Sequence, residues 1–289
     1  MNLYLKKGLS YIKRNIKKGL ITLNSQFHFI EFSLPDFLII GAQKSGTTSL
    51  YSYLVQHPGI IAAECKEVNY FGNPHNWFKG KLWYASHFGT KAYKYLMSKK
   101  LGYLPITGEA SPNMHKPFCP KAVYEALPSV KLIAIFRNPV DRAFSQYQHN
   151  CRHGRETLSF EEAIAQSPLK LPPDVANDIW RYYNSTSRSY IRRGLYAEQL
   201  QHWYQYYSKE RIHIINSDDF FVNPRTELIK VLQFLDIPDF EFDVSRASKH
   251  AGNYKATMKD ETREYLNSLF RPHNRKLFEL IGRDFGWPA

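Results

Sequence analysis

A short loop at residues 41–48 constrains the fold of this chain more than any other feature of its sequence. The loop follows the apolar run 37–40, carries two glycines, and leads into a helical pattern at 48–56. A strand, a glycine-bearing turn and a helix in this order aim several backbone N–H groups and the positive end of a helix dipole at one point. The sequence therefore predicts a phosphate-binding loop.

Short apolar runs alternate with helical patterns from residue 35 onward. We expect strands at 37–40, 131–136 and 211–215, and helices that follow them directly at 48–56, from Asn138 and from Asn223. Pro139 and Pro224 stand at the first helical position, where a helix accepts proline best. Such alternation is typical of βαβ units. The predicted fold is therefore α/β, a P-loop-like parallel sheet flanked by helices on both faces.

The length of the chain fits one domain of this kind. With 289 residues, of which 43% are hydrophobic, the chain can bury a substantial core, and we expect a single domain over 35–289. A helix at 195–207 has a wide apolar face that we expect to be core. The proline-bearing stretch 167–189 is expected to run over the surface, where loops of this length often cover a site.

The first 30 residues are basic and lie outside this domain. Apolar residues recur among the lysines at helical spacing, which predicts a basic amphipathic helix: Leu5, Leu9, Ile12, Ile16 and Leu20. Its apolar stripe either packs on the chain's own domain, the interpretation we favour, or brings residues 1–20 into contact with an anionic membrane surface. The lysines interrupt the segment too often for a signal peptide or a membrane span, so secretion is not expected.

The three cysteines, Cys65, Cys119 and Cys151, are odd in number and have no metal-like spacing. We therefore expect neither a disulfide framework nor a metal site, and a reducing cytoplasm as the compartment. A net charge of +13 implies an anionic partner. The charge alone does not distinguish a nucleotide, a polyanion and a membrane surface. The strongest basic cluster lies in the first 18 residues, which leaves the rest of the chain a moderate excess, and we expect no nucleic-acid partner.

The loop departs from that of a magnesium-dependent nucleotide phosphotransferase. A Walker A loop has lysine directly after its second glycine, whereas Thr47 follows Gly46 here and the loop lysine is Lys44. The apolar strand 131–136 ends in Arg137, where such enzymes commonly have an aspartate that holds magnesium. An arginine there binds an anion. The sequence thus predicts two anion sites at the carboxyl edge of one sheet.

Two anion sites suit a nucleotide with phosphates at its 5′ and 3′ ends, and here the sequence resembles the PAPS-dependent sulfotransferases. Residues 41–48 look like their 5′-phosphosulfate loop, and residues 137–145 look like their 3′-phosphate motif. The resemblance implies transfer of a sulfuryl group (SO3) from PAPS, with PAP as the product and no metal. It also implies that the nucleotide is held by Gly41, Lys44, Ser45, Gly46, Thr47, Thr48, Arg137 and Ser145.

Further segments resemble the branch that includes the heparan sulfate N- and O-sulfotransferases and their bacterial relatives. They are Lys66-Glu67-Val68-Asn69-Tyr70-Phe71, Gly108-Glu109-Ala110-Ser111-Pro112, Gly194-Leu195-Tyr196 and Asp284-Phe285-Gly286-Trp287. A loop that closes on the nucleotide in this branch corresponds to Lys249, His250, Asn253 and Tyr254. Only Lys249 matches firmly, because His250 and Ala251 stand where the branch has glycine and arginine.

The resemblance also implies catalytic roles. Lys44 would stabilise charge on the leaving phosphate, and Glu67 would be the base that deprotonates the acceptor. A carboxylate in that role needs its pKa raised by burial beside aromatic residues such as Tyr70 and Phe71. The alternative is that Glu67 only pairs with a cation such as Lys66.

The acceptor is not identified by the sequence, and a glycan or a small-molecule metabolite fits equally. The expected acceptor contacts are Lys66, Tyr70, Phe71, His75, Ser111 and His115, and the two histidines are also reserve candidates for the base. Arg188, Arg192 and Arg193 either favour an anionic acceptor or are simply solvated at the surface. Two other functions remain open, a magnesium-dependent nucleotide phosphotransferase and a polyanion-binding protein without catalytic activity.

Overall fold

The computed structural model describes residues 30–167, 169–170, 172, 175, 178, 180–182, 189–245 and 257–289. The predicted helix at the N-terminus, Arg188 and the nucleotide contacts Lys249, His250, Asn253 and Tyr254 lie outside these residues. In chain order the elements are β1 (Phe37–Gly41), α2 (Thr47–Leu54), β2 (Ile60–Ala62), α3 (Pro74–Trp77), α4 (Gly80–Ala85), α5 (Lys91–Leu101), β3 (Ile106–Glu109), α6 (Cys119–Ala126), β4 (Lys131–Phe136), α7 (Pro139–Arg152), α8 (Phe160–Ala165), η1 (Arg192–Gly194), α11 (Tyr196–Tyr204), η2 (Lys209–Arg211), β5 (Ile212–Asn216), α12 (Ser217–Val222), α13 (Pro224–Leu235) and α14 (Asp260–Ile281).

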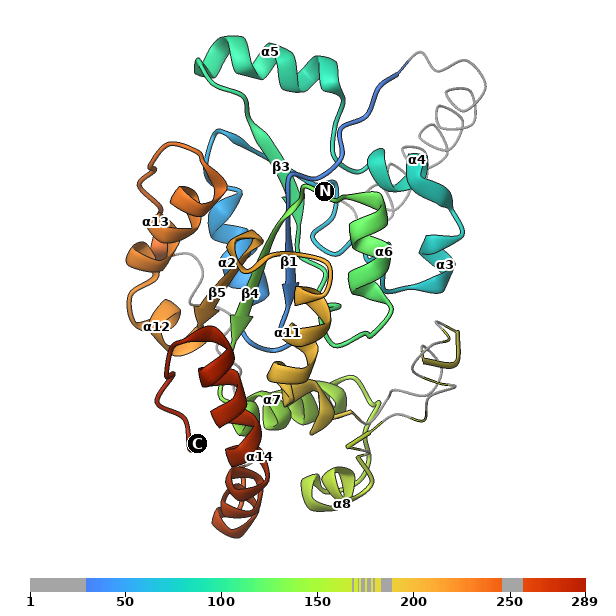
Figure 1. Cartoon of the computed structure of the whole chain (residues 1–289), viewed down its shortest axis with the longest axis vertical. Helices are drawn as coiled ribbons and strands as arrows, with labels where there is room; N and C mark the ends of the chain where they lie inside the picture. The colour runs from blue at the N-terminus through green and yellow to red at the C-terminus, as the bar shows by residue number, and fades with distance from the viewer. Residues whose placement is uncertain are drawn as a thin grey trace, which may run out of the picture.

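The sheet has five strands in the order β2-β3-β1-β4-β5, and every neighbouring pair is parallel. Its centre is β1, which pairs with β3 on one side and β4 on the other (Figure 1). Because all five strands run the same way, their carboxyl ends meet at one edge, and this edge is where ligands bind in open α/β sheets. The predicted parallel sheet is confirmed.

Helices cover both faces of the sheet, as predicted. Along β1, Phe37 and Ile39 face a core formed with α2, α12 and α13, whereas Leu38 and Ile40 face a core formed with α6 and α11. Figure 1 shows α12 and α13 on one side of the sheet and α6 and α11 on the other. The strand is buried on both faces, which explains why its sequence is a continuous apolar run instead of an alternating one.

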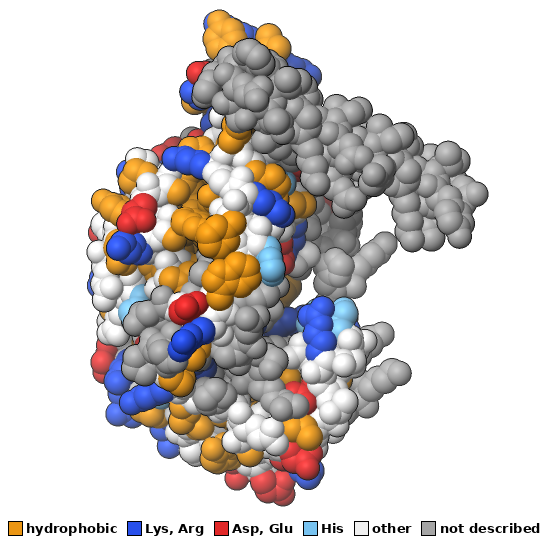
Figure 2. All heavy atoms as spheres, turned by 90° about the vertical axis from the view of Figure 1, so that its right-hand side faces the viewer, with side chains coloured by type: hydrophobic (Ala, Val, Ile, Leu, Met, Phe, Trp, Pro, Cys, Tyr) orange, Lys and Arg blue, Asp and Glu red, His pale blue; other side chains and the backbone are white. Residues whose placement is uncertain are grey.

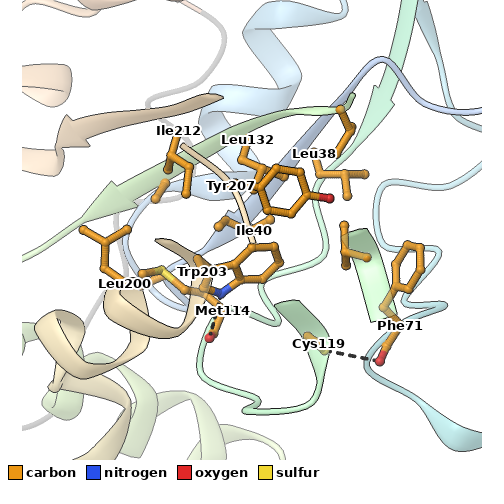
Figure 3. Close-up of a cluster of buried hydrophobic side chains, with 14 of the residues drawn as sticks. Leu38, Ile40, Phe71, Met114, Cys119, Leu132, Leu200, Trp203, Tyr207 and Ile212 are labelled. Carbon is orange, nitrogen blue, oxygen red and sulfur yellow. Dashed lines mark hydrogen bonds between the residues drawn. The ribbon is translucent and has the colours of Figure 1, made fainter. Parts of the chain in front are cut away.

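The core beneath α11 also holds the segments that lead into the carboxyl edge. The indole Nε1 of Trp203 donates to the carbonyl of Met114 at 3.2 Å, and the thiol of Cys119 donates to the carbonyl of Phe71 at 3.2 Å (Figure 3). The expectation that the apolar face of this helix is core is therefore correct. Buried side chains and these two hydrogen bonds fix the loops after β2 and β3.

A third apolar cluster lies at the carboxyl edge itself, among α7, α8 and the first half of α14. Leu266 and Phe270 of α14 pack there against Val140 and Ala143 of α7, while Leu277 in the second half of α14 joins the core beneath α11. In Figure 1 α14 runs along the lower end of the molecule. Helix α14 thus packs both against the cluster at the carboxyl edge and against the core beneath α11.

The predicted starts of two helices are confirmed in detail. Asn138 precedes α7 and its side-chain oxygen accepts the N–H of Val140 at 2.9 Å, and Asn223 accepts the N–H of Thr226 at 3.3 Å before α13. The expectation that a helix from Asn223 follows the last strand directly is wrong, because α12 (Ser217–Val222) comes between them. The short strands β2 and β3 were not predicted from the sequence.

Candidate active site

The loop after β1 leaves the start of α2 open to a ligand. Gly46 precedes the helix with a φ of 109°, a conformation that L side chains rarely adopt, and a Cβ there would lie 3.0 Å from the ring of Phe221. Among the described residues, α2 has no side-chain cap and no acid in its first turn. Its first N–H groups are therefore available to a phosphate, which is the fit that the predicted nucleotide requires.

The side chains of the loop divide into buried and exposed ones. Ser45 and Thr47 are buried, Thr48 is exposed and Lys44 is partly exposed with a φ of 71°. The pKa of His149 is lowered to about 4, first by burial and next by the charge of Lys44. Lys44 and His149 of α7 are therefore close enough for their charges to interact.

Arg137 leaves β4 directly beside the loop. The backbone N–H of Ala42 donates to the carbonyl of Ile135 at 2.7 Å, so the loop and the end of β4 are in contact. The hydroxyl of Tyr196 donates to the carbonyl of Arg137 at 2.9 Å and fixes the backbone there. The two predicted anion sites are therefore neighbours at the carboxyl edge. Ser145, the other residue expected at the 3′-phosphate, lies on α7 and is buried.

A fully buried arginine, Arg142, lies next to this part of the site. Arg142 donates from Nη1 to Gln146 Oε1 at 2.8 Å and from Nη2 to the carbonyl of Tyr190. Burial is the main cause that lowers its pKa to about 10, and the charges of Arg193 and Arg137 act in the same direction. Cations on three segments therefore lie close together, which is unfavourable unless an anion binds among them.

The short helix η1 brings two more arginines to the loop. Gly194 allows this approach, because a Cβ there would lie 2.8 Å from the Cβ of Pro139 and 2.9 Å from the ring of Phe270. Arg193 donates from Nη1 to the side-chain oxygen of Gln43 in the loop and from Nε to Ser189 Oγ at 2.6 Å. η1 is thus attached both to the start of α7 and to the phosphate-binding loop.

Arg192, His115, Lys116 and Tyr182 lie close together, and we call this group of four residues the basic pocket. Arg192 donates from Nη1 to the Tyr182 hydroxyl at 3.2 Å, and this hydroxyl donates to the carbonyl of His115 at 3.1 Å. Nε and Nη2 of Arg192 and Nε2 of His115 are buried without a hydrogen-bond partner among the described residues. Buried polar atoms without partners are costly, so these three nitrogens mark a place for a ligand.

Burial dominates the electrostatics of the basic pocket. It lowers the pKa of His115 well below its ordinary value, and the charges of Arg193, Lys116 and Arg192 add to this effect. Burial also lowers the pKa of Lys116 to about 8. His115 is therefore neutral at physiological pH, and the positive charge of the basic pocket comes from its arginine and lysine side chains.

A buried glutamate at the end of β3 fixes the segment that carries Glu67. Glu109 accepts hydrogen bonds from the N–H of Val68 at 2.9 Å, from Tyr84 Oη at 2.8 Å and from Ser111 Oγ at 2.6 Å. Burial raises the pKa of Glu109, although these donors act in the opposite direction. The carboxylate thus joins the loops after β2 and β3 into one unit at the carboxyl edge.

Glu67 lies at this edge, but not in the environment expected for it. Its side chain is 50% exposed and forms an ion pair of 2.5 Å with Lys66, the alternative that the sequence left open. Tyr70 and Phe71, the aromatic residues expected around it, are buried in the core beneath α11, where Tyr70 stacks on Tyr84 with ring centroids 4.6 Å apart. The expected burial of the carboxylate beside these rings is therefore wrong.

The other expected acceptor contacts lie in three different places. Ser111 is occupied by hydrogen bonds to Glu109 and from the N–H of Asn69, and it organises the backbone. His75 lies on α3 with its ring 4.9 Å from the ring of Trp180. Of the expected contacts only His115 lines the basic pocket. Tyr70, Phe71 and Ser111 are therefore held by contacts within the domain, and their contact with the acceptor stays a prediction.

Two residues of the site were not singled out from the sequence. Glu109 was noted only within a segment of resemblance, and its burial depends on partners more than 20 residues away. Phe221 was not noted at all, and its exposed ring lies against Gly46 beside the loop. The run Phe220, Phe221 and Val222 was the available signal, because three apolar residues in succession on a short helix cannot all face the core.

A parallel sheet with an open phosphate-binding loop after its first strand, and an arginine after the neighbouring strand, defines a transferase that uses a nucleotide as donor. Residues 34–276 match the family model described as "Sulfotransferase domain". The chain belongs to this family, and its domain is of the kind that takes a sulfuryl group from PAPS. The predictions of a phosphotransferase and of a polyanion-binding protein are set aside.

The relatives found by comparison agree with the branch that the sequence resembles. A mouse bifunctional heparan sulfate N-deacetylase/N-sulfotransferase 4 is 30% identical over 86% of this chain, which spans 30% of that protein. A mouse heparan sulfate glucosamine 3-O-sulfotransferase 5 is 26% identical over 99% of this chain and 83% of its own length. The crystal structure of a sulfotransferase from Alicyclobacillus acidocaldarius has a TM-score of 0.67 and 29% identity, covering 89% of this chain and all of that one.

The comparisons correct the predicted compartment. A membrane-associated sulfotransferase of Dictyostelium discoideum is 28% identical over 88% of this chain and 66% of its own length, and this relationship together with the heparan sulfate enzymes contradicts a cytoplasmic protein. The prediction rested on three cysteines, which do not identify a compartment. Within the described ranges no helix is long and apolar enough to cross a bilayer, and no cluster of residues could hold a metal ion.

Proposed function

We propose that this chain transfers a sulfuryl group from PAPS to a hydroxyl or amine of a glycan, and that an anionic group of the glycan binds in the basic pocket. One observation carries the proposal. Nε and Nη2 of Arg192 are buried and have no hydrogen-bond partner among the described residues. The neighbouring Arg193 contacts the phosphate-binding loop. A carboxylate or sulfate on the acceptor would satisfy those donors and place the acceptor beside the donor site.

The donor half of the site rests on the loop and on α7. PAPS supplies the electrophilic sulfur and a phosphate leaving group when it binds. The first N–H groups of α2 and the hydroxyls of Thr47 and Thr48 would hold the 5′-phosphate, and Arg137 with Ser145 would hold the 3′-phosphate. Phe221, exposed beside Gly46, would stack on the base of the nucleotide. Lys44 would neutralise the negative charge that grows on the leaving phosphate.

Support for a glycan acceptor comes from the chemistry of the basic pocket and from the relatives, two of which act on heparan sulfate by name. Lys116 and Arg192 supply fixed positive charge, and the neutral imidazole of His115 supplies a hydrogen-bonding nitrogen. Such a pocket favours an acceptor with an anionic group close to the hydroxyl or amine that is sulfated. A neutral metabolite would leave the guanidinium donors unpaired.

Glu67 is the proposed base. It lies on the segment held by Glu109, and its charge raises the pKa of Lys116, so the carboxylate lies near the basic pocket. Its ion pair with Lys66 is exposed, and an exposed ion pair costs little to break. Release of Lys66 on acceptor binding would free the carboxylate to take a proton from the attacking hydroxyl or amine.

The test compares two glycans of equal length, one with a carboxylate on alternate sugars and one in which every carboxylate is reduced to an alcohol. Turnover is read as PAP formed from PAPS. We expect the carboxylated glycan to be sulfated with the higher kcat/KM, and Arg192→Ala to remove most of the difference by raising KM. Arg271→Ala, on an exposed position of α14, is the matched control and should leave both values unchanged.

Equal turnover of the two glycans would overturn the assignment of the basic pocket, and absence of PAP formation with any acceptor would overturn the transfer itself. Glu67→Gln tests the base separately. It should lower kcat by at least about 100-fold, the usual contribution of general base catalysis, while PAP binds as tightly as to the unmodified chain. If the Glu67→Gln variant keeps its kcat, the base is another residue.

A further inference from the structure

Helix α5 protrudes from the domain at the end opposite to α14 (Figure 1). None of its 11 residues is buried in the described structure. The helix is nevertheless well formed, because Thr90 accepts the N–H of Tyr93 at 3.1 Å before its first turn. Lys94 pairs with Asp36 at 2.8 Å and attaches one face of α5 to the segment before β1. The opposite face is therefore held outward.

The outward face carries large apolar side chains. Tyr93 is 48% exposed, Tyr95 58%, Leu96 66%, and Leu104, just after the helix, 63%. These residues contribute nothing to the hydrophobic cores of the domain. Figure 2 shows hydrophobic and basic side chains together at the same end of the molecule. A cluster of exposed apolar residues on one helix indicates a surface that is covered in the functional state.

The same face is positively charged. The sequence has no aspartate or glutamate between Glu67 and Glu109, and Lys99 and Lys100 are exposed in the last turn of α5. The ammonium of Lys99 lies 5.0 Å from the centre of the Tyr95 ring, so cation and aromatic ring share one part of the surface. The partner of this face is therefore both apolar and anionic.

The segment before β1 pairs with the residues at which α5 begins. The N–H of Ser33 donates to the carbonyl of Gly89 at 2.9 Å, and the N–H of Lys91 donates to the carbonyl of Glu31 at 2.8 Å. Residues 31–33 and the start of α5 are therefore held together by backbone hydrogen bonds.

We infer that the outward face of α5, with Leu104, is a docking surface for a membrane that carries anionic phospholipids. Leucine and tyrosine side chains can enter the boundary between headgroups and acyl chains, while lysines flanking them contact the lipid phosphates. A soluble polyanion would pair with the lysines but would leave Leu96 and Leu104 in water, so it does not account for the apolar side chains.

The experiment uses the full chain and sedimentation with vesicles of phosphatidylcholine alone or of phosphatidylcholine mixed with phosphatidylglycerol. We expect binding to the mixed vesicles and little binding to the neutral ones. The double variants L96S/L104S and K99E/K100E should each lower the affinity for mixed vesicles at least tenfold. R275E/K276E and Tyr265→Ser, on exposed positions of α14 at the other end of the molecule, are the matched controls and should bind as the unmodified chain does.

PAP binding by each variant shows that its fold is intact, because α5 contributes nothing to the nucleotide site. Unchanged vesicle binding by both α5 variants would overturn the inference, and so would equal loss in the α14 controls. Loss of retention on immobilised heparin by K99E/K100E, with vesicle binding unaffected, would assign the face to a soluble polyanion instead. The inference does not depend on the proposed acceptor, so failure of one leaves the other standing.

Discussion

The buried carboxylate of Glu109 accepts a hydrogen bond from the backbone N–H of Val68 at 2.9 Å, and so determines where the neighbouring Glu67 lies. The same carboxylate holds Ser111 and Tyr84. The position of the proposed base therefore depends on a residue that takes no part in the chemistry. This dependence couples the stability of the fold to the geometry of the site.

Replacement of Glu109 by alanine is expected to destabilise the domain by about 3–5 kcal/mol, because three donors lose a buried acceptor. The measurement is the midpoint of urea unfolding. Glu125→Ala, at an exposed position on α6, should change the midpoint little. If both variants unfold at the same urea concentration as the unmodified chain, Glu109 does not hold these segments.

Replacement of Arg137 by alanine should weaken binding of PAP about 10–100-fold, since a hydrogen bond to a charged group contributes roughly 1.5–3 kcal/mol. Titration calorimetry gives the dissociation constant directly. Arg152→Ala removes an exposed arginine from the last turn of α7, the helix that follows Arg137, and should leave PAP binding unchanged. Equal weakening by the two changes would show that only the overall positive charge of this region matters.

Lys44 is expected to act on the transition state more than on the bound nucleotide. Lys44→Ala should reduce kcat about 100–1,000-fold, the usual cost of removing one group that stabilises developing charge, and should weaken PAP binding much less. Single-turnover kinetics with PAPS separates the two effects. A loss confined to nucleotide binding, with the transfer step unaffected, would contradict this role.

Gly194→Ala should destabilise the domain by about 1–3 kcal/mol, because the added methyl group has no room between Pro139 and Phe270. For a domain of this size that lowers Tm by roughly 2–4 °C for each kcal/mol. The shift of η1 should also raise KM for the acceptor more than it weakens PAP binding. Unchanged Tm and KM would show that η1 can move without consequence for the basic pocket.

The pH dependence of stability should reflect His213, whose pKa burial lowers to about 4. Between pH 6.5 and 4 the unfolded chain binds a proton at this residue and the folded chain does not, so stability falls as the pH is lowered through this window. His213→Gln should therefore lose less Tm between pH 7.5 and 5 than the unmodified chain. His202→Gln, at an exposed position, should keep the full loss.

The elements that the sequence predicted correctly are those with local signals. The strand before Gly41, the strand before Arg137 and the asparagine and proline at the start of α7 each depend on neighbours within a few residues. β2 has three residues and β3 contains Gly108, so neither has a run long enough to stand out. Their strand character comes from pairing within the sheet, which the sequence does not display.

The site was predictable to the same extent. The anion-binding residues lie within two short segments, and the structure brings those segments together. His115 and Arg192 were named separately from the sequence, but their grouping in the basic pocket could not be predicted, because Tyr182 reaches His115 across 67 residues. Tyr70 and Phe71 show the converse, since the motif that contains them did not reveal that both rings are buried in the core.

The contact between Arg193 and Gln43 joins the two halves of the site through one side chain. A change in the loop when the nucleotide binds would therefore change the affinity of the proposed acceptor site. Thermodynamic linkage requires acceptor binding to change the nucleotide affinity by the same factor. Donor and acceptor affinities of this enzyme are then not independent quantities. A KM for the acceptor has a defined meaning only together with the concentration of PAPS at which it was measured.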